Sequence, residues 1–380
     1  MSNRAARRRE AKHHAGGTPA AVVATIAPVA MAGASAETVE PEALVVTHYF
    51  DADDLQGSAT VRLTGRRVGA QGNQNLRDAF TQEDRVDGIV AGSGPASVTS
   101  LVYGLTPGEW EVTADVIERV AGHRRASAAS IPPARWSWRR WALTTDAPTR
   151  VKTRFAPLAP LAGIPAVVPG IWPILGVLAV ILAIALQRVM LPHENVVAEV
   201  PLVVPLAALG AGLLGAKIWY AVLHPGPWRK AILGGWAVDG FLVVAPIIAI
   251  AILLAFSMPA GKFLDAVTPG LFVAVAIGRV GCFFAGCCAG RVTDSRWGIW
   301  SSDRKVGARR IPAQILESLA GLAIAAVTTV LILGHAPRID GTIFIGALAV
   351  YLVVRQALLR VRAERREFLW RRTAASRHSA

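Results

Sequence analysis

The stretch GLFVAVAIGRVGCFFAGCCAG at residues 270–290 decides the fold class of this chain. It is apolar almost throughout, and its length is close to the roughly 20 residues that a helix needs to cross the hydrocarbon core of a bilayer. Within it lies Arg279, although an arginine at the bilayer centre costs about 2.5–3.5 kcal/mol even on a lenient insertion scale. An arginine kept in such a helix indicates a buried polar site inside a membrane protein.

Comparable apolar runs recur through the second half of the chain. The chain has 380 residues, of which 53% are hydrophobic and only 17% charged, and this is too apolar for an ordinary pair of soluble domains. The predicted fold class is a polytopic α-helical membrane protein with an N-terminal all-β, sandwich-like domain. Six spanning helices are expected, at residues 170–190, 198–223, 236–257, 264–288, 313–334 and 339–359.

The segment before these helices has a different pattern. Apolar and polar residues alternate in ALVVTHY at 43–49 and ATVRLT at 59–64, with Gly and Pro between the runs, as in short strands joined by turns. The stretch GLTPGEWEVTA at 104–114 resembles the turn and strand of fibronectin-type accessory domains. We therefore expect a β-sandwich-like accessory domain at 42–156, a linker at 157–169 and a transmembrane domain at 170–362.

Both ends of the chain are basic. Residues 1–41 combine a basic tail with an Ala-rich run that reads equally well as a disordered segment or as a signal peptide or anchor. Residues 363–380 form a second basic tail. The formal net charge of +14 is scattered between apolar runs and over both tails, as in the loops of a membrane protein, so nucleic acid is not an expected partner.

Five ionisable residues lie inside the apolar runs, namely Lys217, Asp239, Arg279, Glu317 and Arg355. Taken singly, the basic residues could extend toward an interface and the acidic ones could form structural ion pairs. Taken together, they leave a net positive site within the hydrocarbon. Such a site suits a phosphate, which arginine binds through two parallel hydrogen bonds, and the phosphates available in a bilayer are lipid headgroups.

A second set of arginines supports this site. Tyr351, Arg355 and Arg362 recur at intervals of four and seven residues, so we expect them to share one helix face. Gly278 and Gly281 flank Arg279 and would allow backbone or a ligand to approach its guanidinium closely.

The sequence GRVGCFFAGCCAGRVTDSRWG at 278–298 resembles the signature region of prolipoprotein diacylglyceryl transferases. Other segments resemble that family in the same order, namely LGAKIWY at 214–220, GGWAVDGFL at 234–242, DAVTP at 265–269, PAQILE at 312–317 and YLVVR at 351–355. The resemblance implies a transferase of the bacterial cell membrane, with multiple spans. It would move a diacylglyceryl group from phosphatidylglycerol, or bind another anionic phospholipid, and its acceptor would be the lipobox cysteine of a lipoprotein precursor.

The resemblance also implies roles for individual residues, with no cofactor and no metal. Arg279 and Arg355 would hold and neutralise the phosphate as it leaves, and Asp239 stands where the family has a histidine proposed as the base. The expected substrate-binding residues are Lys217, Tyr220, Gly278, Gly281, Cys282, Gly286, Gly290, Gln314, Glu317, Tyr351 and Arg362.

Several positions depart from the family pattern. Cys282 replaces an asparagine, Cys287 a glutamate and Ile311 a histidine. Phosphate-holding residues are therefore kept while residues for proton transfer are changed. This leaves an alternative function open, in which a non-catalytic or differently acting paralogue binds anionic phospholipid and presents the β domain.

Cys282, Cys287 and Cys288 fall within seven residues of one another. A redox or metal site is conceivable, but tetrahedral zinc takes four ligands and the sequence supplies no nearby histidine or CxxC spacing as the fourth. Small buried packing residues are the expected role.

The side of the membrane on which the β domain lies is predicted differently by two arguments. The family resemblance places the arginine motif outside the cytoplasm, and a signal anchor at residues 20–36 would carry the β domain to the same side, so that the β domain and the 291–310 loop would both be extracytoplasmic. The positive-inside rule would place the basic 291–310 loop in the cytoplasm. We favour the first, because arginines that bind anionic headgroups distort the charge count.

Overall fold

A computed structural model gives the arrangement of most of the chain. It describes residues 42–53, 55, 57–69, 78–120, 123–126, 150–161, 163–196, 203–223, 237–335 and 339–363. The basic segment 1–41, with its possible signal or anchor, and the basic tail after residue 363 lie outside the described residues.

The N-terminal part forms two antiparallel sheets, as the alternating sequence predicts. One sheet has the strand order β8-β1-β4-β10-β9, in which β9 (Ile299–Ser302) and β10 (Val306–Arg310) come from a later loop, and the other has β3-β2-β5-β6 with β7 paired to β5. The strands of the N-terminal part are β1 (Glu42–Asp51), β2 (Gly57–Arg67), β3 (Ala79–Ile89), β4 (Pro95–Tyr103), β5 (Glu109–Val120), β6 (His123–Ala126), β7 (Arg150–Lys152) and β8 (Arg154–Phe155), and the 3-10 helix η1 (Ala156–Leu161) follows them.

One apolar core joins the two sheets. The side chain of Trp110 in β5 is fully buried and packs against Phe80 of β3, with ring centroids 5.7 Å apart. Leu44 and Val98 from the opposite sheet belong to the same core cluster. One face of each sheet thus lies inside, which confirms the all-β prediction.

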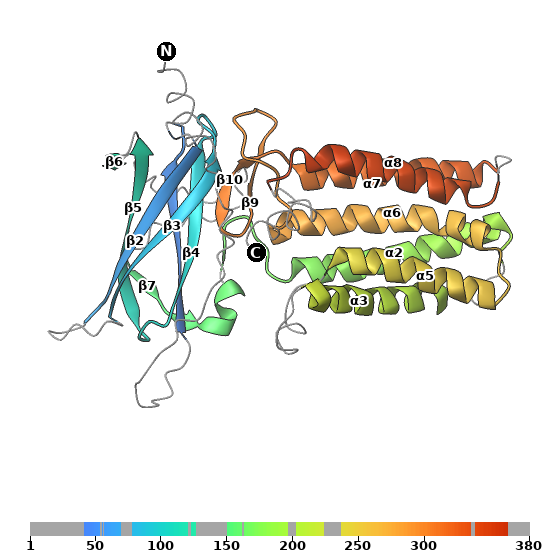
Figure 1. The fold of residues 1–380 in the computed structure, drawn as a ribbon, viewed down its shortest axis with the longest axis horizontal. Helices are drawn as coiled ribbons and strands as arrows, with labels where there is room; N and C mark the ends of the chain where they lie inside the picture. Colours follow the sequence, from blue (N-terminus) through green and yellow to red (C-terminus); the bar gives the residue numbers. More distant parts are fainter. Residues whose placement is uncertain are drawn as a thin grey trace, which may run out of the picture. The chain divides into compact units, whose positions relative to one another are not determined.

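The C-terminal part is a bundle of apolar helices (Figure 1). Five of them are long and apolar enough to cross a membrane, and α5 contributes a shorter apolar helix. The described helices are α2 (Ile171–Met190), the 3-10 helix η2 (Leu191–Glu194), α3 (Val203–Leu223), α5 (Val238–Ala255), α6 (Ala260–Ala285), α7 (Ala313–Leu333) and α8 (Thr342–Leu359). The prediction of a polytopic helical domain is confirmed, although α6 ends three residues before its expected end.

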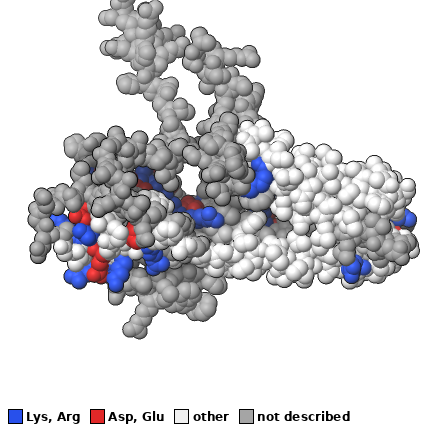
Figure 2. Space-filling model, turned by 90° about the horizontal axis from the view of Figure 1, so that it is seen from below, with Lys and Arg blue, Asp and Glu red and all other residues white. Residues whose placement is uncertain are grey.

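Large apolar side chains cover the outside of these helices. Leu254, Val330 and Val353 are each about two-thirds exposed, at 67%, 68% and 70%. The face seen in Figure 2 carries few charged side chains over the helices and many over the β sheets. Soluble monomers rarely expose large contiguous apolar patches, so this outer face is suited to lipid.

The loop between α6 and α7 contributes two strands to the N-terminal sheet. These strands, β9 (Ile299–Ser302) and β10 (Val306–Arg310), pair with each other, and β10 pairs with β4 through Gly307 and Ser97 (Figure 1). The buried ring of Trp300 donates its Nε1 hydrogen to the carbonyl oxygen of Pro95 at 2.9 Å. The sequence pattern did not predict that this loop would add two strands to the N-terminal sheet.

An ion pair fixes the same hairpin to the other sheet. Lys305 Nζ lies 2.8 Å from Asp84 Oδ1 in β3, and Ser100 of β4 donates to the second oxygen of Asp84. Burial tends to raise the pKa of Asp84, but the bonds from Lys305 and Ser100 outweigh burial and hold this pKa below its usual value. The Asp84 carboxylate therefore stays charged at neutral pH and links β3, β4 and the turn of the β9–β10 hairpin.

Shared strand pairing also constrains the topology. A sheet cannot continue through the bilayer, so the β domain and the 291–310 loop must lie on the same side of the membrane. Among the described residues, four helices, α2, α3, α5 and α6, lie between them in the chain. A crossing by each of these four, the shorter apolar α5 included, returns the chain to the side from which it started.

We expect Asp84→Asn to loosen the β9–β10 hairpin, because a hydrogen bond to a charged group contributes about 1.5–3 kcal/mol. Amide hydrogen exchange in β10 should become about ten- to a hundredfold faster, since about 1.4 kcal/mol corresponds to a factor of ten. In the native protein the Asp84 carboxylate should stabilise the hairpin from neutral pH down to about pH 4, the unfolded pKa of aspartate. This stabilisation should be lost only below that pH. The control is Asp87→Asn, which removes an exposed pair with Arg85 and should leave β10 unchanged.

We also expect cysteines introduced at Thr81 and Ser295, two exposed positions on the β domain and the loop, to react together with an impermeant maleimide. The protein would carry serine at the three native cysteines. Labelling of both in intact cells is the expected result and places both segments outside. Labelling of both only after lysis would reverse the side, and labelling of one without the other would contradict the shared sheet.

Candidate functional site

The Glu317 carboxylate is the centre of the buried polar site in the helical domain. Its side chain has no solvent exposure. Oε1 accepts a hydrogen bond from the Tyr351 hydroxyl at 2.8 Å and lies 2.8 Å from Arg355 Nη1 and 3.1 Å from Arg279 Nη2, while Oε2 pairs with Arg362 Nη2. We call these five residues the arginine cage. The structural ion pair that the sequence allowed for Glu317 is confirmed, and it involves three arginines.

Three helices bring the cage together. Arg279 lies on α6, Glu317 on α7, and Tyr351 and Arg355 one turn apart on α8. Ser318 ties α7 to α6 by donating its hydroxyl hydrogen to the Ala276 carbonyl at 2.9 Å. Contact between these helices therefore sets the positions of the charged groups.

Asp265 fixes the far end of α8 to α6. This buried carboxylate accepts hydrogen bonds from the backbone N–H groups of Gly341 at 2.8 Å and Phe344 at 2.9 Å, at the start of α8. A carboxylate there satisfies unpaired N–H groups and favours the positive end of the helix dipole. In the sequence, Asp265 stands out only as part of a family segment. An aspartate in an apolar run nevertheless indicates a buried hydrogen-bond donor, here the start of α8.

Arg362 reaches the cage by a route that the sequence did not predict. It lies beyond the end of α8, so the expectation that it shares a helix face with Tyr351 and Arg355 is wrong. Its segment instead pairs with the loop after α6, through a bridge between Gly290 and Arg362. A Cβ at Gly290 would collide with the carbonyl oxygen of Ile311, so this crossing requires glycine.

The cage retains positive charge and accessible donors. Three guanidinium groups against one carboxylate leave two positive charges. The side chains of Arg279 and Arg355 are 15% and 17% exposed, whereas that of Arg362 is 6% exposed. Because each guanidinium has five N–H donors, Arg279 and Arg355 can bind an anion while they remain paired with Glu317.

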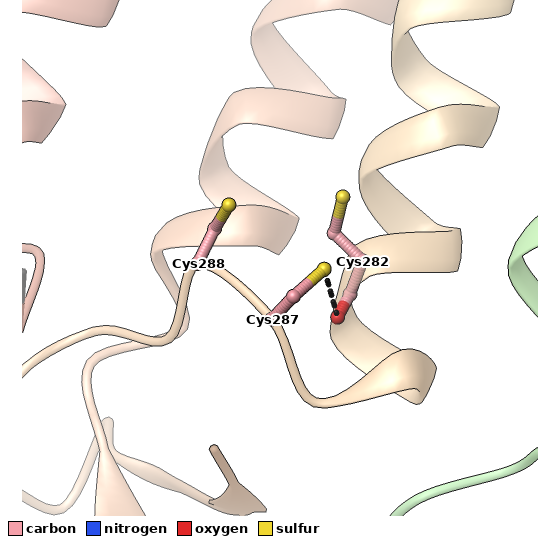
Figure 3. A group of neighbouring side chains, drawn as sticks. All are labelled: Cys282, Cys287 and Cys288. Carbon is pink, nitrogen blue, oxygen red and sulfur yellow. Dashed lines mark hydrogen bonds between the residues drawn. The ribbon is translucent and has the colours of Figure 1, made fainter. Parts of the chain in front are cut away.

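Three thiols lie together beside the cage. The side chains of Cys282, Cys287 and Cys288 place their sulfur atoms within 4.8 Å of one another, and Figure 3 shows Cys282 on α6 and the other two on the loop that follows. We call these residues the thiol cluster. None of the three is fully buried, in contrast to the expectation of buried packing residues.

The end of α6 creates this arrangement. Gly286 caps the helix in the left-handed region, at φ 65°, and turns the chain back so that the Cys287 thiol donates to the Cys282 carbonyl at 3.6 Å (Figure 3). Gln314, buried at the start of α7, donates from Nε2 to the Cys287 carbonyl at 2.9 Å. Gly286 and Gln314 thus hold the thiol-bearing loop.

The other residues named from the sequence lie at different distances from this site. Gly278 and Gly281 are on α6 beside Arg279, and a Cβ at Gly278 would meet open space. Lys217 and Tyr220 are on α3, which packs chiefly against α5. Asp239 falls in α5, but its side chain lies outside the described part of the structure.

Comparison with known proteins bears on the same region. Residues 167–377 match the family described as prolipoprotein diacylglyceryl transferase. Phosphatidylglycerol–prolipoprotein diacylglyceryl transferase 2 of Clostridium perfringens is 32% identical over 127 residues, which cover 30% of this chain and 48% of that protein. The corresponding transferase of Dehalococcoides mccartyi is 28% identical over 166 residues, 40% of this chain and 62% of its own.

A third relative, the transferase of Corynebacterium efficiens, is 28% identical over 159 residues, 37% of this chain and 49% of its own. The chain thus spans about half to three-fifths of the length of these curated relatives. The family match covers more than half of the chain and contains every residue of the arginine cage and the thiol cluster. The chain belongs to the prolipoprotein diacylglyceryl transferase family.

Proposed function

We propose that this protein is a multi-pass transferase of the bacterial cell membrane. It moves the diacylglyceryl group of phosphatidylglycerol to the cysteine thiol of a lipoprotein precursor. The arginine cage carries this proposal, because a net positive site within apolar helices fits an anionic lipid headgroup. Family membership supports the same substrates.

The chemistry follows from the charges. The acceptor thiol loses its proton, and the thiolate sulfur forms a bond to the glyceryl carbon next to the phosphate. The C–O bond of that carbon breaks, its electron pair stays with the phosphate oxygen, and glycerol phosphate leaves. Arg279 and Arg355 stabilise the negative charge that develops on the phosphate, in a site where few water molecules compete.

A second candidate function has its own observation. Cys282, Cys287 and Ile311 stand at positions where the resemblance implies other side chains for proton transfer. Under this alternative the cage binds phosphatidylglycerol or another anionic lipid without transferring it, and the protein presents its β domain.

A reconstitution experiment separates the two functions. Purified protein in vesicles that contain phosphatidylglycerol with labelled acyl chains is mixed with a lipobox peptide, and the peptide mass is followed. Transfer should add the diacylglyceryl group to the cysteine peptide and not to a serine peptide of the same sequence. Binding of phosphatidylglycerol without any product on the cysteine peptide would establish the second function instead.

We expect Arg279→Gln and Arg355→Gln each to lower the transfer rate by about 10²–10³-fold, which is the typical loss on removing one donor to a developing negative charge. Arg360→Gln is the matched control, because it removes an exposed arginine just after α8 that is not part of the cage. Full transfer by both cage variants would place the phosphate site elsewhere.

We further expect Asp239→Asn to abolish transfer while phosphatidylglycerol binding is retained, if this carboxylate takes the proton of the acceptor thiol. Restored activity in Asp239→His would support a role as base. Equal rates for the native protein and Asp239→Asn, measured from pH 5 to 9 because a base shows itself as an ascending limb of the pH profile, would remove Asp239 from the mechanism.

A further inference from the structure

The thiol cluster has the composition of a metal site with one position open. Among the described residues, the group of potential metal ligands that meet in one place consists of Cys282, Cys287 and Cys288. Catalytic zinc sites use three protein ligands and leave the fourth position to water or substrate. A group of three thiols with no fourth ligand among the described residues therefore matches the number of protein ligands in a catalytic zinc site.

The distances suit a tetrahedral ion. With metal–sulfur bonds of about 2.3 Å, the sulfur atoms of a tetrahedral site lie roughly 3.8 Å apart. The three sulfur atoms here lie within 4.8 Å of one another, so small side-chain rotations would close them around an ion. Thiolate ligands favour thiophilic ions such as zinc over magnesium or calcium.

The backbone holds the thiols in this position at some energetic cost. Cys288 has a φ of 55°, a left-handed conformation that is uncommon for a residue with a side chain. This conformation follows the left-handed Gly286 and the hydrogen bond from Gln314 to Cys287. Strain at a residue of this kind is found where the side chain has a specific task.

The position of the cluster connects it to the transfer reaction. Cys282 lies one helical turn after Arg279 on α6, and Arg279 and Arg362 are within electrostatic reach of Cys288. A ligand bound to an ion at the cluster would therefore lie next to a phosphate bound to the arginine cage.

We infer that the thiol cluster binds a zinc-like divalent ion whose fourth ligand is the acceptor cysteine of the lipoprotein precursor. This inference rests on the proposed function. A metal-bound thiol is deprotonated near neutral pH, so the ion would supply a thiolate where the family pattern of proton-transfer residues has changed. The thiol proton is released to solvent when the ion binds the sulfur, and the sulfur then attacks the glyceryl carbon while glycerol phosphate leaves.

Cobalt spectroscopy tests the site without relying on transfer activity. The full-length protein, purified in detergent with a reductant and stripped of metal by a chelator, is titrated with Co²⁺ alone. We expect one ion per chain, with thiolate-to-cobalt charge-transfer bands in the near ultraviolet and visible bands of a tetrahedral ion, displaced by Zn²⁺. Serine at any one of the three cysteines should weaken binding by at least about tenfold, since altering even an outer-shell partner costs that much.

A matched control tests whether cobalt binds at a pair of histidines and not at the thiol cluster. His193 and His335 have ring centroids 5.9 Å apart near the ends of α2 and α7, and could bind cobalt by themselves. His193→Ala should leave the charge-transfer bands unchanged. Bands that disappear in this variant, or that form at the same cobalt concentration when Cys288 is serine, would overturn the inference.

The role of the fourth ligand is tested by adding the lipobox peptide to the cobalt protein. The cysteine peptide should increase the charge-transfer intensity and shift the visible bands, and the serine peptide should not. An unchanged spectrum would overturn the assignment of the acceptor. Arg279→Gln should still bind cobalt and peptide even without transfer, so failure of the metal site and failure of the proposed function give different results.

Two further measurements cover variants that do not fold. Thermal melting in the chelator shows whether each serine variant keeps the native fold. If one does not, two measurements on the native protein decide whether the thiol cluster binds metal. They are its metal content and the degree to which Zn²⁺ protects the three native thiols from an alkylating reagent. Three thiols that react at the same rate with and without Zn²⁺ would overturn the inference.

Discussion

A carboxylate that is fully removed from water determines the arrangement of the transmembrane domain. Glu317 has no exposure, and an uncompensated charge in that position would cost several kcal/mol. Three arginines and a tyrosine from α6, α8 and the segment after α8 compensate it. Breaking such a buried network by removing one partner typically costs about 3–5 kcal/mol. The same contacts that position the arginines for a phosphate therefore also hold the three helices in register.

Sequence reasoning could find the charged residues of this site because each of them is costly in a membrane. Arg279, Glu317 and Arg355 stand out in apolar runs, and the structure joins them. Helical spacing predicts that Arg362 shares a helix face with Tyr351 and Arg355. That prediction is wrong because α8 ends at Leu359. Its place depends on a bridge to Gly290, a contact between segments 72 positions apart that no local pattern reveals.

The thiol cluster and the β9–β10 hairpin were beyond sequence reasoning for related reasons. Had α6 continued to residue 288, Cys282 and Cys287 would be five positions apart on different parts of its surface; the left-handed end at Gly286 brings them together. The hairpin strands are only four and five residues long and rich in Ser and Arg, so they have the composition of a basic loop. Their pairing partner, β4, lies some two hundred residues earlier in the chain.

The mixed sheet has a consequence for biosynthesis. β4 pairs with β1 on one side and with β10 on the other, so during synthesis it is an open edge strand, with unpaired N–H and C=O groups, until β10 has emerged. Among the described helices, α2, α3, α5 and α6 precede β10 in the chain, and those that cross the bilayer must be inserted before that happens. Edge strands of this kind readily pair with other chains. Completion of the accessory domain is thus timed by membrane insertion, and a ribosome paused within α3 or α5 would hold a domain that still needs protection from aggregation.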